Sequence, residues 1–172
     1  MLKIPVTKED HIQGDMDAPI SLLEYGDYEC SYCGLAYPIV KRIQKHFGKR
    51  LRFVFRNFPL VESHPHAGIA AMAAEFASLH HQFWEMHDLL YENQHALDIS
   101  DLLKYAKSLN LSVVDLKTAI ENETFSKNIK NDFLGGVQSG VNGTPTFFIN
   151  GNHYKGSFEY EDLLMAIEQV KK

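Results

Sequence analysis

The spacing of apolar residues changes twice between residues 19 and 58, and this change limits the folds open to the chain. Residues 19–25, PISLLEY, form a short apolar run that is typical of a strand buried within a sheet. An amphipathic helix is predicted from Cys33 to about Gly48. Its apolar residues recur at every fourth position: Leu35, Ile39, Ile43 and Phe47. Residues 51–58, LRFVFRNF, alternate and are rich in aromatic and branched side chains, which predicts a second strand and completes a right-handed βαβ unit.

Residues 64 to about 140 have almost no strand signal. Four helices are predicted there, within HAGIAAMAAEFASL, FWEMHDLLY, SDLLKYAKSL and VVDLKTAIE. Ser100 and Ser112 are the expected N-caps of the last two. The segment TFFINGNHYKG then predicts a hairpin with an Asn-Gly turn, and LLMAIEQV predicts a closing amphipathic helix.

The expected fold class is therefore α/β, with four strands in one mixed sheet and helices on both sides. Residues 1–60 and 141–172 would form one domain, and residues 61–140 an all-helical insertion within it. With 172 residues, 45% of them apolar, the chain can bury a core. Its net charge of -5 argues against a nucleic-acid partner.

The N-terminus MLKIPVTKEDH has no apolar run of the kind that marks a signal peptide. No window reaches the roughly 18 apolar residues that cross a bilayer, so no stable membrane association is expected. These features favour a cytoplasmic protein, or a periplasmic one if a leader has been removed. A monomer and a dimer are both compatible with the sequence.

The only two cysteines, Cys30 and Cys33, stand two residues apart where the first predicted strand gives way to the helix. A C-x-x-C pair beside a βαβ unit is typical of a redox couple. Free N–H groups and the positive end of the helix dipole favour a thiolate there. We expect an exposed Cys30 that attacks disulfides and a Cys33 that resolves the mixed disulfide.

Two other interpretations of the cysteine pair remain open. A structural zinc site needs four ligands and usually two such pairs, whereas this chain offers only His64 and His66 as further candidates. The cysteines could also be inert neighbours in a core. No metal or organic cofactor is required by the redox interpretation.

Glu24 lies inside the apolar strand, six residues before Cys30. A carboxyl group there should be partly buried with a raised pKa, so it could exchange a proton with Cys33. The alternative is an edge position that points into solvent. Pro38 removes one hydrogen bond within the helix and predicts a kink after its first turn.

These residues resemble the DsbA-like branch of the thioredoxin-fold thiol–disulfide oxidoreductases. The resemblance covers nearly the whole chain and rests on four segments: DHIQGDMDAPISLLEYGDYECSYC, RFVFRNFPL, HPHAGIAA and GTPTFFING. It implies a thioredoxin fold with an all-helical insertion that covers the cysteine face. The implied activity is exchange of disulfides with protein or peptide substrates, with a redox partner protein or glutathione resetting the pair.

The same resemblance assigns roles to single residues. It implies that Cys30 is the nucleophile, Cys33 the resolving cysteine and Glu24 the buried acid. Pro145 would be a cis-proline that faces the cysteines, preceded by Thr144, whose backbone would pair with an extended substrate. Between the cysteines stand Ser31 and Tyr32, which we also expect to contact substrate. Strongly oxidising relatives carry a histidine between the cysteines, and Tyr32 supplies no such charge.

Other functions are compatible with parts of the sequence. A peptide-binding or chaperone module on the same scaffold would use the helical insertion and an apolar rim formed by Tyr25, Tyr28 and Tyr32. Glutathione-linked transferases also use this fold, but they usually lack the second cysteine. The histidines of the insertion are expected at the surface or in packing contacts, and four aromatic and Met side chains in its core: Phe83, Trp84, Met86 and Tyr91.

Overall fold

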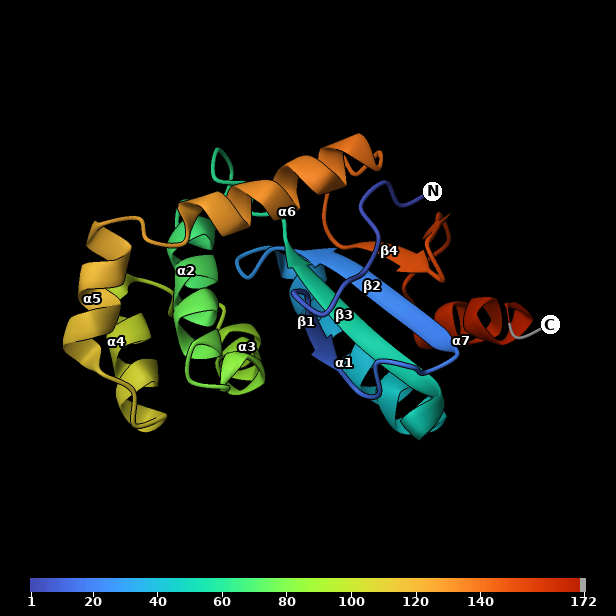
Figure 1. The fold of residues 1–172 in the computed structure, drawn as a ribbon, viewed down its shortest axis with the longest axis horizontal. Helices are drawn as coiled ribbons and strands as arrows, with labels where there is room; N and C mark the ends of the chain where they lie inside the picture. The colour runs from blue at the N-terminus through green and yellow to red at the C-terminus, as the bar shows by residue number, and fades with distance from the viewer. Residues whose placement is uncertain (171–172) are drawn as a thin grey trace.

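Five strands form a single mixed sheet in the part of the chain, residues 1–170, that the computed structural model describes (Figure 1). They are β1 (His11–Gln13), β2 (Ile20–Gly26), β3 (Leu51–Asn57), β4 (Thr146–Ile149) and β5 (Asn152–Tyr154). Their order is β1-β3-β2-β4-β5, with β2 parallel to β3 and the other pairs antiparallel. The α/β class and the mixed sheet are confirmed, but the count of four strands was wrong. The three-residue β1 is half-buried and has no apolar run that would predict it.

The central strand β2 is buried along its whole length because both faces of the sheet are covered. Ile20 and Leu22 point to the face packed by α1 (Ser31–Phe47) and α7 (Tyr160–Gln169). Leu23 and Tyr25 point to the opposite face, where they meet Phe58 and other apolar side chains. Alternate residues of one strand thus serve two cores, which explains its nearly unbroken apolar sequence.

Helix α1 begins directly after Cys30 and ends at Phe47, followed by a short 3-10 turn at Gly48–Arg50. It runs through Pro38 as one helix. The buried stripe is Cys33, Ala36, Val40, Ile43 and Phe47. The predicted stripe was therefore rotated slightly, because Leu35 is 60% exposed beside the cysteines.

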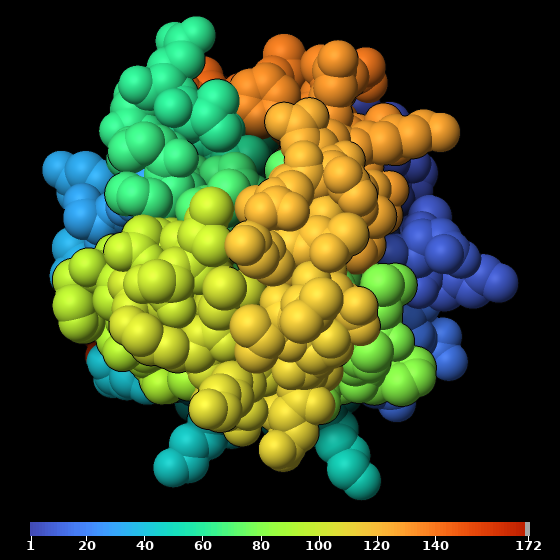
Figure 2. All heavy atoms as spheres, turned by 90° about the vertical axis from the view of Figure 1, so that its left-hand side faces the viewer, coloured from blue at the N-terminus to red at the C-terminus, as the bar shows by residue number. Residues whose placement is uncertain are grey.

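Helices α2 to α6 lie between β3 and β4, and α2 to α5 gather at one end of the sheet (Figure 1). They are α2 (Ala67–Ser78), α3 (Phe83–Glu92), α4 (Ile99–Ser108), α5 (Val113–Glu121) and α6 (Ser126–Gln138). Figure 2 looks onto this end, where α4 and α5, in yellow-green and gold, form the centre of the surface. The prediction missed α6, whose sequence contains two adjacent glycines and few strongly apolar residues.

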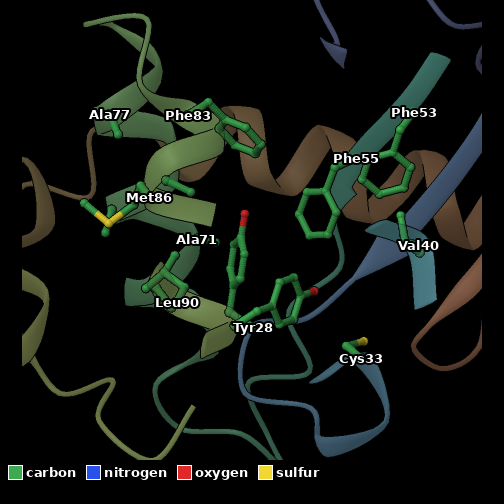
Figure 3. Packing of buried hydrophobic residues seen from close by; sticks show 14 of the residues in the cluster. Tyr28, Cys33, Val40, Phe53, Phe55, Ala71, Ala77, Phe83, Met86 and Leu90 are labelled. Atoms are coloured by element: carbon green, nitrogen blue, oxygen red, sulfur yellow. The ribbon is translucent and has the colours of Figure 1, made fainter. Parts of the chain in front are cut away.

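The insertion shares its core with the sheet. Figure 3 shows Met86 and Leu90 of α3 near Ala71 of α2, with the ring of Phe55 from β3 facing them across the core. Phe83, Met86 and Tyr91 are buried and Trp84 is partly buried in this cluster, as predicted. The helical region is therefore packed onto the sheet.

One of the two predicted helix caps is correct. The Ser112 hydroxyl accepts a hydrogen bond from the backbone N–H of Asp115 at 3.2 Å, at the start of α5. Ser100 lies inside the first turn of α4, where Asp98 accepts from the N–H of Asp101 at 3.0 Å instead. Helix α4 begins earlier than predicted because Asp98 offers an equally good cap two residues upstream.

Within residues 1–170, no helix is long and apolar enough to cross a membrane.

Candidate active site

Both cysteines lie where β2 leads into α1. Cys30 is the N-cap residue, and its backbone N–H donates to the carbonyl of Asp27 at 3.2 Å. Cys33 stands in the first turn of α1 and is fully buried. Figure 3 shows it at the edge of the apolar cluster that contains Tyr28 and Val40. Both side chains are free thiols in this structure.

Cys30 lies against the chain segment that precedes β4. Its thiol donates to the backbone carbonyl of Thr144 at 3.4 Å, although the two residues are 114 positions apart in sequence. The Thr144–Pro145 peptide bond is cis. Cys30 is only 6% exposed, so the expectation of an openly exposed thiol was wrong.

Cys30 favours the thiolate. Its pKa is lowered from 9.0 to about 5, chiefly because the Cys33 thiol donates a hydrogen bond to it. Burial acts in the opposite direction, but hydrogen bonds from the backbone N–H groups of Cys33 and Tyr32 stabilise the thiolate further. A thiolate at this position follows from several donors that converge at a helix N-terminus.

Cys33 has the opposite preference. Burial raises the pKa of its thiol well above the usual value of 9.0, and the hydrogen bond to Cys30 and the charges of Glu24 and Cys30 raise it further. The pair therefore consists of one sulfur that is ready to attack and one that holds its proton. This division of states suits sequential thiol–disulfide exchange.

Glu24 lies in the middle of β2 and is 2% exposed. Its predicted burial is confirmed. Burial first, and the charge of Cys30 second, raise its pKa from 4.5 to about 8. Its Oε1 has no hydrogen-bond partner among the residues that the structure describes. A carboxyl group in this state can hold or accept a proton near neutral pH.

The residues between the cysteines are exposed. Ser31 is the first residue of α1, and Tyr32 is 62% exposed. The apolar rim of three tyrosines was wrong for two members, because Tyr25 and Tyr28 are at most 1% exposed. Tyr25 packs on the far face of the sheet and Tyr28 packs under the cysteines. Leu35, three residues after Tyr32, is also an exposed apolar side chain.

Asp27 was not among the predicted site residues. Asp27 is 1% exposed and its carboxylate contacts Nδ1 of His64 at 2.8 Å. Nδ1 of His66 contacts Glu29, also at 2.8 Å. A signal was present in the sequence, since acidic residues flank the first cysteine and the HPH segment follows the second strand.

His64 and His66 therefore each contact a carboxylate and not a cysteine. Within residues 1–170, no group of three or more His, Cys, Asp or Glu side chains is arranged to hold a metal ion. The insertion histidine His87 is buried and contacts the Tyr28 hydroxyl at 3.0 Å, whereas His80 and His81 are exposed.

The fold and the cysteine pair define a class, the DsbA-like thiol–disulfide oxidoreductases. The solved structures that share this fold include BdbD and an alpha-DsbA1. BdbD from Bacillus subtilis in its oxidised form aligns with a TM-score of 0.87 and 27% identity, over 98% of this chain and 96% of that chain. The alpha-DsbA1 of Wolbachia pipientis aligns with a TM-score of 0.84 and 22% identity, over 98% and 94%.

A family model described as thioredoxin matches residues 6–169, so the chain belongs to the thioredoxin family. Curated relatives carry a different name. Na(+)/H(+) antiporter NhaA 1 of Salinispora arenicola is 42% identical over 96% of this chain. The NhaA antiporter of Herminiimonas arsenicoxydans is 36% identical over the whole chain. This chain spans only about a quarter of the length of these relatives, 26% and 27%.

Proposed function

We propose that the protein exchanges disulfides with protein or peptide substrates through a Cys30 mixed disulfide that Cys33 resolves. The observation that carries this proposal is the pair of opposite pKa shifts. The pKa of Cys30 is lowered to about 5, and that of Cys33 is raised well above 9.0. Near neutral pH only Cys30 is a thiolate, so the order of attack is fixed.

In the reducing direction, the Cys30 thiolate attacks one sulfur of a substrate disulfide. The Cys30–substrate disulfide forms, the substrate disulfide breaks, and the second substrate sulfur leaves as a thiolate that takes a proton. Cys33 then loses its proton and attacks the Cys30 sulfur, which releases the first substrate sulfur. The substrate gains two electrons and two protons, and the protein is left with a Cys30–Cys33 disulfide. Oxidation of a substrate dithiol runs the same steps backwards.

Glu24 is the proposed acceptor of the Cys33 proton. In the reduced protein, a pKa of about 8 keeps Glu24 mostly protonated at neutral pH. Formation of the Cys30 mixed disulfide removes the Cys30 charge that helps to raise this pKa, so Glu24 can release its proton to solvent and then accept the one from Cys33. The negative charge of the Cys30 thiolate helps to hold the Cys33 proton in place until that thiolate is consumed. Attack by Cys30 therefore prepares the second step, because it removes one of the charges that oppose ionisation of Cys33.

Substrate would bind across the segment before β4. We propose that the backbone of Thr144 and Pro145 pairs with an extended peptide and that Ser31 and Tyr32 contact it from the helix side. The contact between Cys30 and the Thr144 carbonyl supports this placement. The two cysteines carry both electrons, so the reaction uses no metal or organic cofactor. A redox partner protein or glutathione would reset the pair. The Na⁺/H⁺ transport named for the curated relatives belongs to proteins about four times as long, and the proposal covers the thiol–disulfide chemistry alone.

Equilibration in glutathione buffers of graded ratio tests the proposal, because it gives the reduction potential of the Cys30–Cys33 pair. A potential near −270 mV, like that of thioredoxin, supports a reductase that works in the cytoplasm, and one near −120 mV supports a strong oxidant outside it. Cys30→Ser should lose exchange activity, and Cys33→Ser should trap substrate on Cys30. Full exchange activity in Cys30→Ser, or no Cys30–Cys33 disulfide on oxidation, refutes the proposal.

A further inference from the structure

Two histidines that the exchange mechanism does not use lie next to the acidic residues around Cys30. His64 and His66 stand on the turn between β3 and α2. The ring of His64 contacts the carboxylate of Asp27, and the ring of His66 contacts that of Glu29, each at 2.8 Å. Both acids belong to the short connection between β2 and Cys30.

Asp27 fixes His64 relative to the active-site cysteine. Its side chain is fully buried, and Oδ2 accepts both from the backbone N–H of Leu60 and from His64, each at 2.8 Å. Oδ1 accepts from the N–H of Glu29 at 2.8 Å. The backbone carbonyl of the same Asp27 receives the N–H of Cys30. Asp27 thus contacts the imidazole through its side chain and the cysteine through its main chain.

The charges around His64 favour the imidazolium. Partial burial lowers its pKa, but the hydrogen bond and charge of Asp27, followed by the charges of Cys30 and Glu29, outweigh burial and raise it. Electrostatic coupling is mutual, so an imidazolium that gains stability from the Cys30 thiolate stabilises that thiolate by the same amount. The His64 side chain is 25% exposed, which lets it take its proton from solvent.

We propose that His64, oriented by Asp27, supplies the positive charge that stabilises the Cys30 thiolate. Ser31 and Tyr32, between the cysteines, carry no positive charge. The stabilising charge comes instead from a histidine 34 positions after Cys30. His64 is not a catalytic residue in this proposal, because it does not touch the substrate. Its positive charge acts on the Cys30 thiolate through space. The inference rests on the proposed exchange reaction and adds to it a determinant of the reduction potential. Stabilising the thiolate stabilises the reduced protein, so His64 makes the pair more oxidising.

The first test compares His64→Gln, which removes the charge, with His64→Lys, which restores a charge, and with His66→Gln as the matched control. The rate of Cys30 alkylation against pH gives the Cys30 pKa, and glutathione equilibration gives the reduction potential. His64→Gln should raise the Cys30 pKa and shift the redox equilibrium toward the disulfide about three- to tenfold, the size expected for one partly screened charge. His64→Lys should reverse most of this change. His66→Gln should not produce it, because the His66 side chain is 42% exposed and contacts Glu29 instead of Asp27.

The pH dependence of the reduction potential distinguishes loss of the His64 charge from a structural effect of the substitution. The difference in potential between wild type and His64→Gln should be present where His64 is protonated and disappear at higher pH where it is neutral. A difference that persists unchanged, or His64→Lys behaving like His64→Gln, overturns the inference. So does a wild-type value of the Cys30 pKa in His64→Gln.

A second measurement needs no variant. Titration of the His64 ring by NMR in the reduced and in the disulfide form of the wild-type protein should give a higher pKa in the reduced form, because only that form carries the thiolate. Equal values in the two forms overturn the inference even if His64→Gln fails to fold. A wild-type protein without any Cys30–Cys33 redox transition refutes the proposed function instead, so the two failures are distinguishable.

Discussion

Replacing Glu24 by glutamine should stabilise the folded, reduced protein near neutral pH and change it little in acid. The carboxyl group lies within β2, is 2% exposed, and has one oxygen without a partner among the residues that the structure describes. Glutamine keeps the size of the side chain and never ionises. The substitution therefore isolates the cost of a buried carboxylate.

The magnitude follows from the pKa of about 8, compared with 4.5 for an unperturbed glutamic acid. One pKa unit corresponds to about 1.4 kcal/mol, so ionising Glu24 in the folded protein costs roughly 5 kcal/mol more than in water. Between pH 4.5 and about pH 8 the folded chain keeps a proton that the unfolded chain releases. The free energy of unfolding consequently falls as pH rises through this window. At pH 7 the accumulated loss is about 3 kcal/mol, which Glu24→Gln avoids.

Denaturant unfolding of the reduced proteins at several pH values measures this effect. The difference between variant and wild type should be small about one pH unit below 4.5, grow with pH, and level off above about 8. Glu62→Gln on the exposed turn before α2 is the control and should stay within about 0.5 kcal/mol of wild type. A Glu24→Gln difference that does not depend on pH would show that Glu24 is not the titrating group and would refute the reasoning.

The same variant should lose activity while it gains stability. If Glu24 accepts the Cys33 proton, glutamine removes the acceptor, and resolution of the Cys30 mixed disulfide should slow by roughly 100-fold. Stopped-flow measurement of product release separates this step from the first attack by Cys30, which should keep nearly its wild-type rate. An unchanged resolution rate would leave Glu24 with no part in proton transfer.

Three further predictions follow from single contacts. Cys33→Ala should raise the Cys30 pKa above about 5, measured by alkylation rate against pH, because the leading hydrogen bond to the thiolate is removed; an unchanged value would contradict this cause. Gly26→Ala should destabilise the fold by about 1–3 kcal/mol, since a Cβ at this position would collide with the ring of Phe55, and normal thermal unfolding would refute that tight packing. Asp98→Ala should lower the denaturant midpoint of unfolding because α4 loses its cap, and Ser100→Ala should lower it less. The reverse ranking would restore Ser100 as the cap.

The βαβ unit, the helices α2 to α5 and the hairpin were predictable because each depends on a local pattern. The amphipathic period of α1 and the Asn-Gly turn before β5 are properties of neighbouring residues. The placement of Cys30 at a helix start and the burial of Glu24 follow from the same local order. By contrast, β1 has only three residues and gains its structure from pairing with β3, some 40 residues later in the chain. Helix α6 was missed because its two adjacent glycines weaken every local helix signal.

The sequence by itself determined which two sulfurs form the proposed redox couple, because the chain has only two cysteines and they stand two residues apart at a helix start. Only the tertiary structure decided how far the pKa values of the two thiols shift. It brings the Thr144 carbonyl to within 3.4 Å of Cys30 and covers that cysteine to 6% exposure. It also joins Asp27 to His64 across 37 positions. Burial and distance set the electrostatic energy of a charge, and both are properties of the packed chain that no local pattern of residues contains.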